Sequence, residues 1–221
     1  MVGITNLSAQ TFLAGNLTNR DSALAWFDEI LGVDQSGLVG GTIHESQSTS
    51  PTSDPFFESR FWAKSTIKYR GQAYQDVYLL YDIENQMVTL DRPGGFTSIS
   101  LLLSNDNIEW FEMHGHKFVN LKNRDGFYDW MVMGEQLDLF VRRSKVETVN
   151  TNDLIVEYQE LTKIFVRKDD QIYPVRSKKD IIKLYPEDKQ MIKKYIRSNG
   201  LKINIRNESD IVLLTRYCDQ L

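Results

Sequence analysis

Apolar and polar residues alternate along much of the chain, as they do in strands that have one buried face and one face in water. In residues 61–69, Phe61, Ile67 and Tyr69 fall on one face and polar side chains on the other. The next apolar run, residues 74–83, has large side chains on both faces, which is typical of a central strand covered on two sides. The alternation predicts a sheet organised around these two runs.

Turn-forming residues separate the apolar runs at short and regular intervals, with glycine, asparagine or aspartate between them. Residues 147–153 are polar and are interpreted as a connection. The spacing predicts an antiparallel β-meander sheet or a partly open barrel. Its further strands are expected over residues 87–90, 96–103, 108–113, 116–121, 127–133, 137–142, 155–167 and 171–175.

Two parts of the chain have helical periodicity. Residues 19–32 predict one short N-terminal helix, and the period changes again after the last expected strand. Ser177 with Asp180 resembles a capping box, Pro186 suits the first turn of a second helix, and Ser209 can cap a third. The fold class predicted is therefore α+β, with the C-terminal helices packed on the sheet.

The domain organisation follows from these elements. Residues 1–55 are expected to supply the N-terminal helix and a polar loop to the same domain as the sheet. Residues 56–176 form the antiparallel sheet core, and residues 177–221 form the helical segment packed on it. The chain is therefore interpreted as one domain.

Charge is divided unevenly along the chain. Residues 1–140 carry 9 Lys/Arg against 18 Asp/Glu, whereas residues 141–221 carry 17 against 12. The acids of the second part are interleaved with its bases, which favours a solvated helical surface over a polyanion-binding arm. No nucleic-acid partner is expected. No apolar run approaches the length of a membrane span, so no transmembrane segment is expected either.

The order of several motifs resembles a known family. YQDVYLLYDI, WFEMHGHKFVNL, GFYDWMVMGE and the run from IFVRKDD to NGLKI resemble a family of exported proteins of unassigned function that is widespread in Bacteroidota. The likeness covers about residues 56–221. It implies a periplasmic or cell-envelope location and carries no catalytic residue with it.

The N-terminus gives a partial export signal. LSAQ at residues 7–10 resembles the small-residue end of a signal peptide, but the charged region and most of the apolar region are missing. A cytoplasmic location is therefore the alternative, and whether the true N-terminus lies upstream of Met1 is left open.

The only metal-like pattern is His114-Gly115-His116. An H-x-H spacing on a strand points both imidazoles to one face, as a metal site needs. Gly115, however, stands where a hairpin turns, and histidine tolerates a positive φ better than most residues. We interpret the motif as a turn, with His114 and His116 as weak metal candidates, and expect no cofactor.

No catalytic residue is predicted. The chain lacks a nucleophile elbow and a phosphate-binding loop, and nothing in the sequence places any two carboxylates together. Aromatic residues are the remaining signal, because those outside the core would mark a binding surface. Trp62, Tyr78 and Trp130 are the candidate binding residues, since they fall opposite or beside the clearer core positions.

Three functions follow from this pattern. The favoured hypothesis is a non-enzymatic binding or scaffold protein of the bacterial cell envelope, with another envelope protein as its partner and its oligomeric state left open. The alternative is a carrier of a small apolar ligand in a barrel-like cavity lined by Val77, Leu79 and Tyr81. The second alternative is an enzyme whose site combines His114 or His116 with distant carboxylates.

Overall fold

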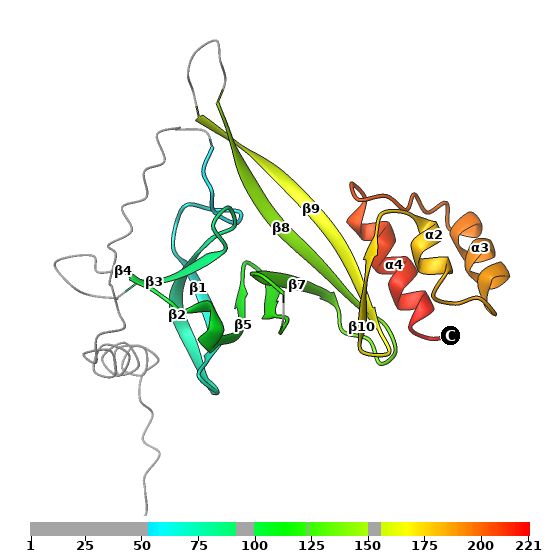
Figure 1. Cartoon of the computed structure of the whole chain (residues 1–221), viewed down its shortest axis with the longest axis horizontal. Helices are drawn as coiled ribbons and strands as arrows, with labels where there is room; N and C mark the ends of the chain where they lie inside the picture. Colours follow the sequence, from blue (N-terminus) through cyan, green and yellow to red (C-terminus); the bar gives the residue numbers. More distant parts are fainter. Residues whose placement is uncertain (1–52, 92–99, 123, 150–155) are drawn as a thin grey trace, which may run out of the picture.

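A computed structural model describes residues 53–91, 100–122, 124–149 and 156–221. In this part of the chain, ten strands form one antiparallel sheet and three α-helices follow it (Figure 1). The strands are β1 (Ala63–Tyr69), β2 (Gln72–Asp82), β3 (Met87–Asp91), β4 (Ser100–Leu102), β5 (Ile108–Met113), β6 (His116–Asn120), β7 (Phe127–Val132), β8 (Asp138–Val149), β9 (Val156–Lys168) and β10 (Gln171–Val175). The helices are α2 (Lys178–Ile182), α3 (Lys189–Ser198) and α4 (Glu208–Cys218).

The sheet consists of two meanders that meet at one pair of strands. Its order is β10-β9-β8-β7-β6-β5-β1-β2-β3-β4, so β5 returns to pair with β1. The sheet is open, with β4 and β10 at its edges. Both edges discourage further pairing, because β4 has only three residues and β10 contains Pro174. A sheet-dominated α+β fold is thus confirmed, and the sheet is not a closed barrel.

The two faces of the sheet are defined by cross-strand register. Phe111 pairs with Phe118, Phe118 with Asp129, and Asp129 with Val141, so these residues share what we call the inner face. Their neighbours in sequence point the other way and form the outer face, because successive side chains of a strand alternate.

Aromatic rings fill the inner face of the first half of the sheet. Tyr81 on β2 contacts Phe111, Phe118 and Phe127, with ring centroids 5.1, 5.1 and 5.8 Å apart. Since β2 and β7 lie on opposite sides of β1, β5 and β6, these contacts show that the sheet curls around its own core.

The inner face of the second half shares a buried cluster with the helices. Leu139 and Val141 of β8 and Ile164 of β9 belong to the same cluster as Ile192 of α3 and Leu214 of α4. Figure 1 shows the helices grouped at one end of the molecule, beside β8, β9 and β10.

Gln86 closes the curl of the sheet where β8 separates from β7. Its amide nitrogen donates to the carbonyl oxygens of Ile83 and Arg143, at 2.6 and 3.0 Å. Its amide oxygen accepts from the Tyr81 hydroxyl at 2.7 Å and from the backbone N–H of Phe127 at 3.3 Å. One buried side chain therefore satisfies polar groups from β2, the β2–β3 turn, β7 and β8.

Four sequence predictions were wrong in detail. Pro186 does not stand in the first turn of a helix, because α3 begins only at Lys189. The first strand begins at Ala63, so Phe61 is not in the core and is 75% exposed. β8 continues through residues 143–149, because the backbone of β9 pairs with it throughout. The sequence prediction ended this strand at Arg142 and interpreted residues 147–153 as a connection. Asn207, not Ser209, is the N-cap residue of α4.

Of the helix predictions, one is confirmed and one falls outside the described residues. The capping box at Ser177 and Asp180 begins α2, with the Asp180 carboxylate accepting from the Ser177 backbone N–H at 2.9 Å. The predicted helix over residues 19–32 lies outside the described residues. None of the described helices is both long enough and apolar enough to cross a membrane.

Candidate functional site

A short irregular segment before β1 positions Glu58, the first residue of the candidate site. The backbone of Pro55 and Phe57 pairs with Ile83 and Tyr81 at the end of β2. The chain then leaves the sheet at Glu58, which has a positive φ of 55°, and returns as β1. The loop formed by residues 58–62 places the Glu58 carboxylate beside the β5–β6 turn.

The β5–β6 turn is the hairpin that the sequence predicted. His114 and Gly115 adopt positive φ values of 50° and 78°, as the type I′ two-residue hairpin turn requires at both positions. His116 is consequently the first residue of β6, and its ring lies on the inner face near Phe57, at 5.2 Å between ring centroids.

A polar network runs from this turn to α4 across the inner face. The Asp129 carboxylate accepts hydrogen bonds from His116 Nδ1 and Arg143 Nε, both at 2.8 Å. The guanidinium of Arg143 also donates to both carboxylate oxygens of Glu208, at 3.1 and 2.9 Å. His116 Nε2 lies 3.5 Å from Glu58. We call Glu58, His116, Asp129, Arg143 and Glu208 the polar network.

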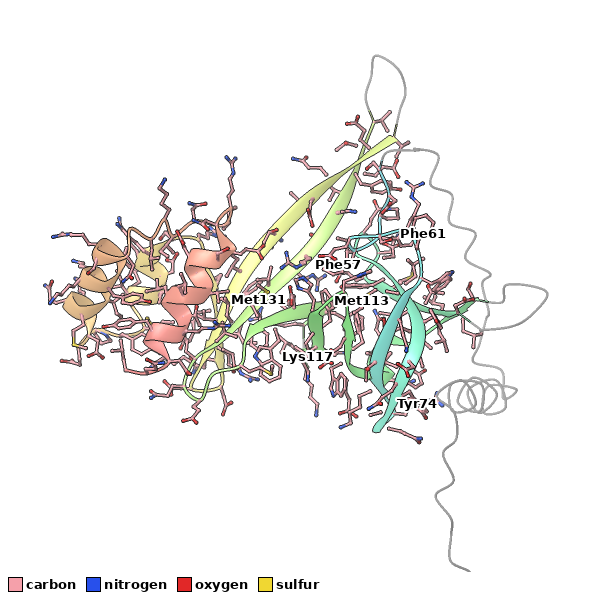
Figure 2. The ribbon with its side chains drawn as sticks, turned by 180° about the vertical axis from the view of Figure 1, so that it is seen from behind. Phe57, Phe61, Tyr74, Met113, Lys117 and Met131 are labelled. Carbon is pink, nitrogen blue, oxygen red and sulfur yellow. The ribbon has the colours of Figure 1, made fainter. Side chains whose placement is uncertain are left out.

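The polar network lies between the two hydrophobic clusters of the inner face. Phe57 belongs to the first cluster, and Met131 packs against the second. Arg143 touches both, with its guanidinium 5.9 Å from the Phe57 ring and 3.8 Å from the Met131 sulfur. Figure 2 shows Phe57, Met113 and Met131 in the middle of the molecule, between the helices and the β1–β2 hairpin.

The two most buried charges of the network, those of Asp129 and Arg143, are paired with each other. The Asp129 side chain is only 2% exposed and that of Arg143 11%, so each depends on its partners to remain charged away from water. Among the described residues, no group of three or more potential ligands could hold a metal ion. His114 lies 4.0 Å from Glu58, and the two histidines share only that carboxylate as a neighbour.

The hydrogen bond with Asp129 raises the pKa of His116 above its ordinary value. A raised pKa in the folded state stabilises the protein at pH below about 6.5, and this contribution is lost as pH rises through the folded-state pKa. We therefore expect the free energy of unfolding to fall between about pH 6 and pH 8 more steeply in the wild type than in His116→Gln. Urea unfolding across this range measures it. His114→Gln, in the same turn, is the control and should keep the wild-type slope; equal slopes in the wild type and His116→Gln would contradict the prediction.

The outer face of β5–β9 has a second group of notable side chains. Val119, Tyr128 and Phe140 are buried there, and partly buried side chains pack around them. We call this set the aromatic stripe; its partly buried members are Trp110, Leu121, Trp130 and Phe165.

Cations lie over the rings of the aromatic stripe. The Lys117 ammonium is 4.5 Å from the Trp110 ring, and the guanidinium of Arg142 is 5.4 Å from the Tyr128 ring. Arg124 lies 5.4 Å from Phe165. Lys117 and Phe57 lie on opposite sides of the strand layer (Figure 2). Each such contact at a partly exposed site contributes about 0.5–1 kcal/mol and holds both side chains in place.

The structure does not bring the three predicted binding residues together. Trp130 belongs to the aromatic stripe, where its indole N–H donates to Asp138 at 2.9 Å. Tyr78 is 38% exposed on β2, with β1, β5 and β6 between it and β7. Trp62 is half-buried in the loop before β1.

The cavity expected for an apolar ligand is occupied by side chains. Val77, Leu79 and Tyr81 are at most 1% exposed and belong to the first core cluster. Phe111 and Phe118 stack at 5.0 Å between centroids within the same cluster. The carrier hypothesis gains no support from this packing.

Sequence reasoning missed most members of both groups. The alternation in WFEM places Trp110 and Phe111 on opposite faces of the strand, so the outer position of Trp110 could be predicted from the sequence. The polar network could not be predicted from the sequence, because its carboxylates and Arg143 meet through the register of three strands and through the position of α4.

The chain has been compared with protein-family models, curated proteins and solved structures. No family model, curated protein or solved structure matches it.

Proposed function

We propose that the protein is a non-enzymatic binding protein of the bacterial cell envelope and that it holds a protein partner against its aromatic stripe. The observation that carries this proposal is a row of aromatic rings, three of them half-buried, on a face of the sheet that no described helix covers. The inner face of the same strands takes part in the two main core clusters, so burial in the monomer does not require rings on the outer face. The envelope location rests on the family resemblance.

The composition of the aromatic stripe fits a protein partner. Tryptophan, tyrosine and arginine are enriched where binding energy concentrates in protein interfaces. Trp110, Trp130 and Tyr128 each carry a cation over the ring, which holds the ring in place before a partner arrives. A preorganised surface loses less side-chain entropy on binding.

A specific observation also favours a second candidate function, proton-transfer catalysis at His116. Asp129 holds Nδ1 of His116, as an orienting carboxylate does for a general base. Nε2, however, faces the Glu58 carboxylate, and the guanidinium of Arg143 forms ion pairs with Asp129 and Glu208. This arrangement is explained by pairing of buried charges, so the binding function is the stronger conclusion.

The proposed function is tested with the full-length protein in intact cells. A photo-crosslinking amino acid at position 117, beside Trp110, is expected to capture a discrete protein, whereas the same probe at position 61 is not. With the captured partner purified, Trp110→Ala should weaken binding at least about tenfold, because aromatic anchors are typical hot spots.

Phe61→Ala is the matched control, since Phe61 is an exposed aromatic residue away from the aromatic stripe. It should leave the affinity unchanged. Equal loss in the two variants, or equal capture from positions 61 and 117, would contradict a partner on the stripe. Substrate turnover by the purified protein that disappears in His116→Ala would favour the enzyme instead.

A further inference from the structure

A groove between the C-terminal helices is lined by basic and apolar side chains. It runs between α2, α3 and the segment that follows α3, and encloses about 600 Å³. A smaller groove of about 390 Å³ continues it along residues 201–204 and shares Lys178, Lys179 and Leu201 with it. Figure 1 shows α2 and α3 side by side at the end of the molecule farthest from β1–β4.

Five cationic side chains surround this pair of grooves. They come from α2, from α3 and from the segment after α3, and are Lys178, Lys179, Lys193, Arg197 and Lys202. None of them forms an ion pair with a described residue. The fold therefore brings together positive charges from three segments without pairing them directly with acids of the described residues.

The nearest acids of this region are held by backbone groups. The Asp180 carboxylate accepts from the backbone N–H groups of Arg176 and Ser177, at 3.0 and 2.9 Å. The Asp210 carboxylate accepts from the backbone N–H of Lys202 at 2.7 Å. These hydrogen bonds hold both carboxylates against the backbone, and neither forms an ion pair with a lysine or arginine of the groove.

The floor of the groove is apolar. Ile182 and Ile196 are 8% and 7% exposed, and Leu201 is half-buried beside them. No aromatic ring lines either groove, so the stacking platforms that single-stranded nucleic acids use are missing from this lining. A ligand that satisfies both parts of the lining combines an anionic group with a short apolar part.

We propose that this groove binds an anionic phospholipid, with its phosphate held among the lysines and the start of its acyl chains on the isoleucine floor. Clusters of basic residues attract anionic lipid headgroups, and each cation near the surface adds to the affinity. The charge of the chain favours a local site, because the basic excess is confined to the part that follows residue 140. The groove lies on a different part of the molecule from the aromatic stripe and does not depend on the proposed protein partner.

The experiment uses the full-length protein and vesicles of two compositions. We expect co-sedimentation with vesicles of phosphatidylcholine containing phosphatidylglycerol, and none with pure phosphatidylcholine. Added salt should weaken the binding, because exposed charges are screened. Lys193→Gln/Arg197→Gln should lower the affinity at least about tenfold.

Lys189→Gln/Lys194→Gln is the matched control, because it removes two positive charges from the same helix at exposed positions outside the groove. Its affinity should stay within about threefold of the wild type. Circular dichroism of both variants confirms that α3 is retained, and Lys179→Gln tests the groove from α2.

Three results would overturn the proposal. The first is no binding to the anionic vesicles, and the second is equal loss of affinity in the groove variant and its control. The third is displacement of the vesicles by inorganic phosphate at low concentration, since a free anion would then suffice and the apolar floor would play no part.

Discussion

Removing residues 177–221 is expected to leave a protein that aggregates. The deletion exposes the inner-face side chains of β8 and β9 that share a cluster with Ile192 and Leu214. Each large apolar side chain that loses its cover forfeits roughly 1.5–3 kcal/mol. The same deletion removes Glu208 and leaves Arg143 with one carboxylate fewer. Size-exclusion chromatography and thermal unfolding of residues 1–176 test the prediction.

A matched pair of substitutions in α4 tests the same cause without a deletion. Leu214 is fully buried, whereas its neighbour Leu213 is 45% exposed. Leu214→Asp should reproduce the aggregation, and Leu213→Asp should leave the protein soluble. A soluble, monomeric 1–176 protein as stable as the full chain would show instead that the helices form an independent module, and the one-domain interpretation would be wrong.

Replacing Arg143 by methionine is expected to destabilise the fold by about 3–5 kcal/mol, because it leaves a buried carboxylate without its main counter-charge. The Asp129 side chain is only 2% exposed and would keep His116 as its charged neighbour only when the ring is protonated. Urea unfolding at pH 7 measures the loss of stability.

Arg142→Met is the control for this substitution, because Arg142 is the preceding residue of β8 and faces Tyr128 on the outer face. It should cost at most about 1 kcal/mol, as expected for a cation–π contact at a partly exposed site. Adding Asp129→Asn to Arg143→Met should recover part of the lost stability, since the stranded charge is removed. Equal losses in the two single variants would show that the polar network contributes no more than an ordinary arginine contact.

Most of the sheet could be predicted from local sequence signals. The alternation in β1 and β2 and the turn at His114 and Gly115 identified the strands and the hairpin, because both depend on residues close in sequence. The capping box at Ser177 located the start of α2 for the same reason. The predicted positions of strand ends were less accurate, as the loop after Phe57 and the extension of β8 show.

The polar network could not be predicted, because its members meet only in three dimensions. Arg143 lies 14 residues from Asp129 and 65 residues from Glu208. Each residue taken alone resembles an ordinary charged side chain on a solvated strand or helix. The register of β6, β7 and β8 turns them inward, and register depends on pairing across the whole sheet.

The strand order has a consequence for how the chain reaches its fold. Every pair of neighbouring strands joins elements that follow one another in the chain, with the single exception of β1 with β5. Short-range hairpins form fast, whereas a ladder between distant segments must first close a long loop. Each meander can therefore assemble by itself, and the β1–β5 ladder is the step that unites them. The contacts of Gln86 with Arg143 and of Lys145 with Asp54 also join the two meanders, so the native sheet is held together at a second place as well.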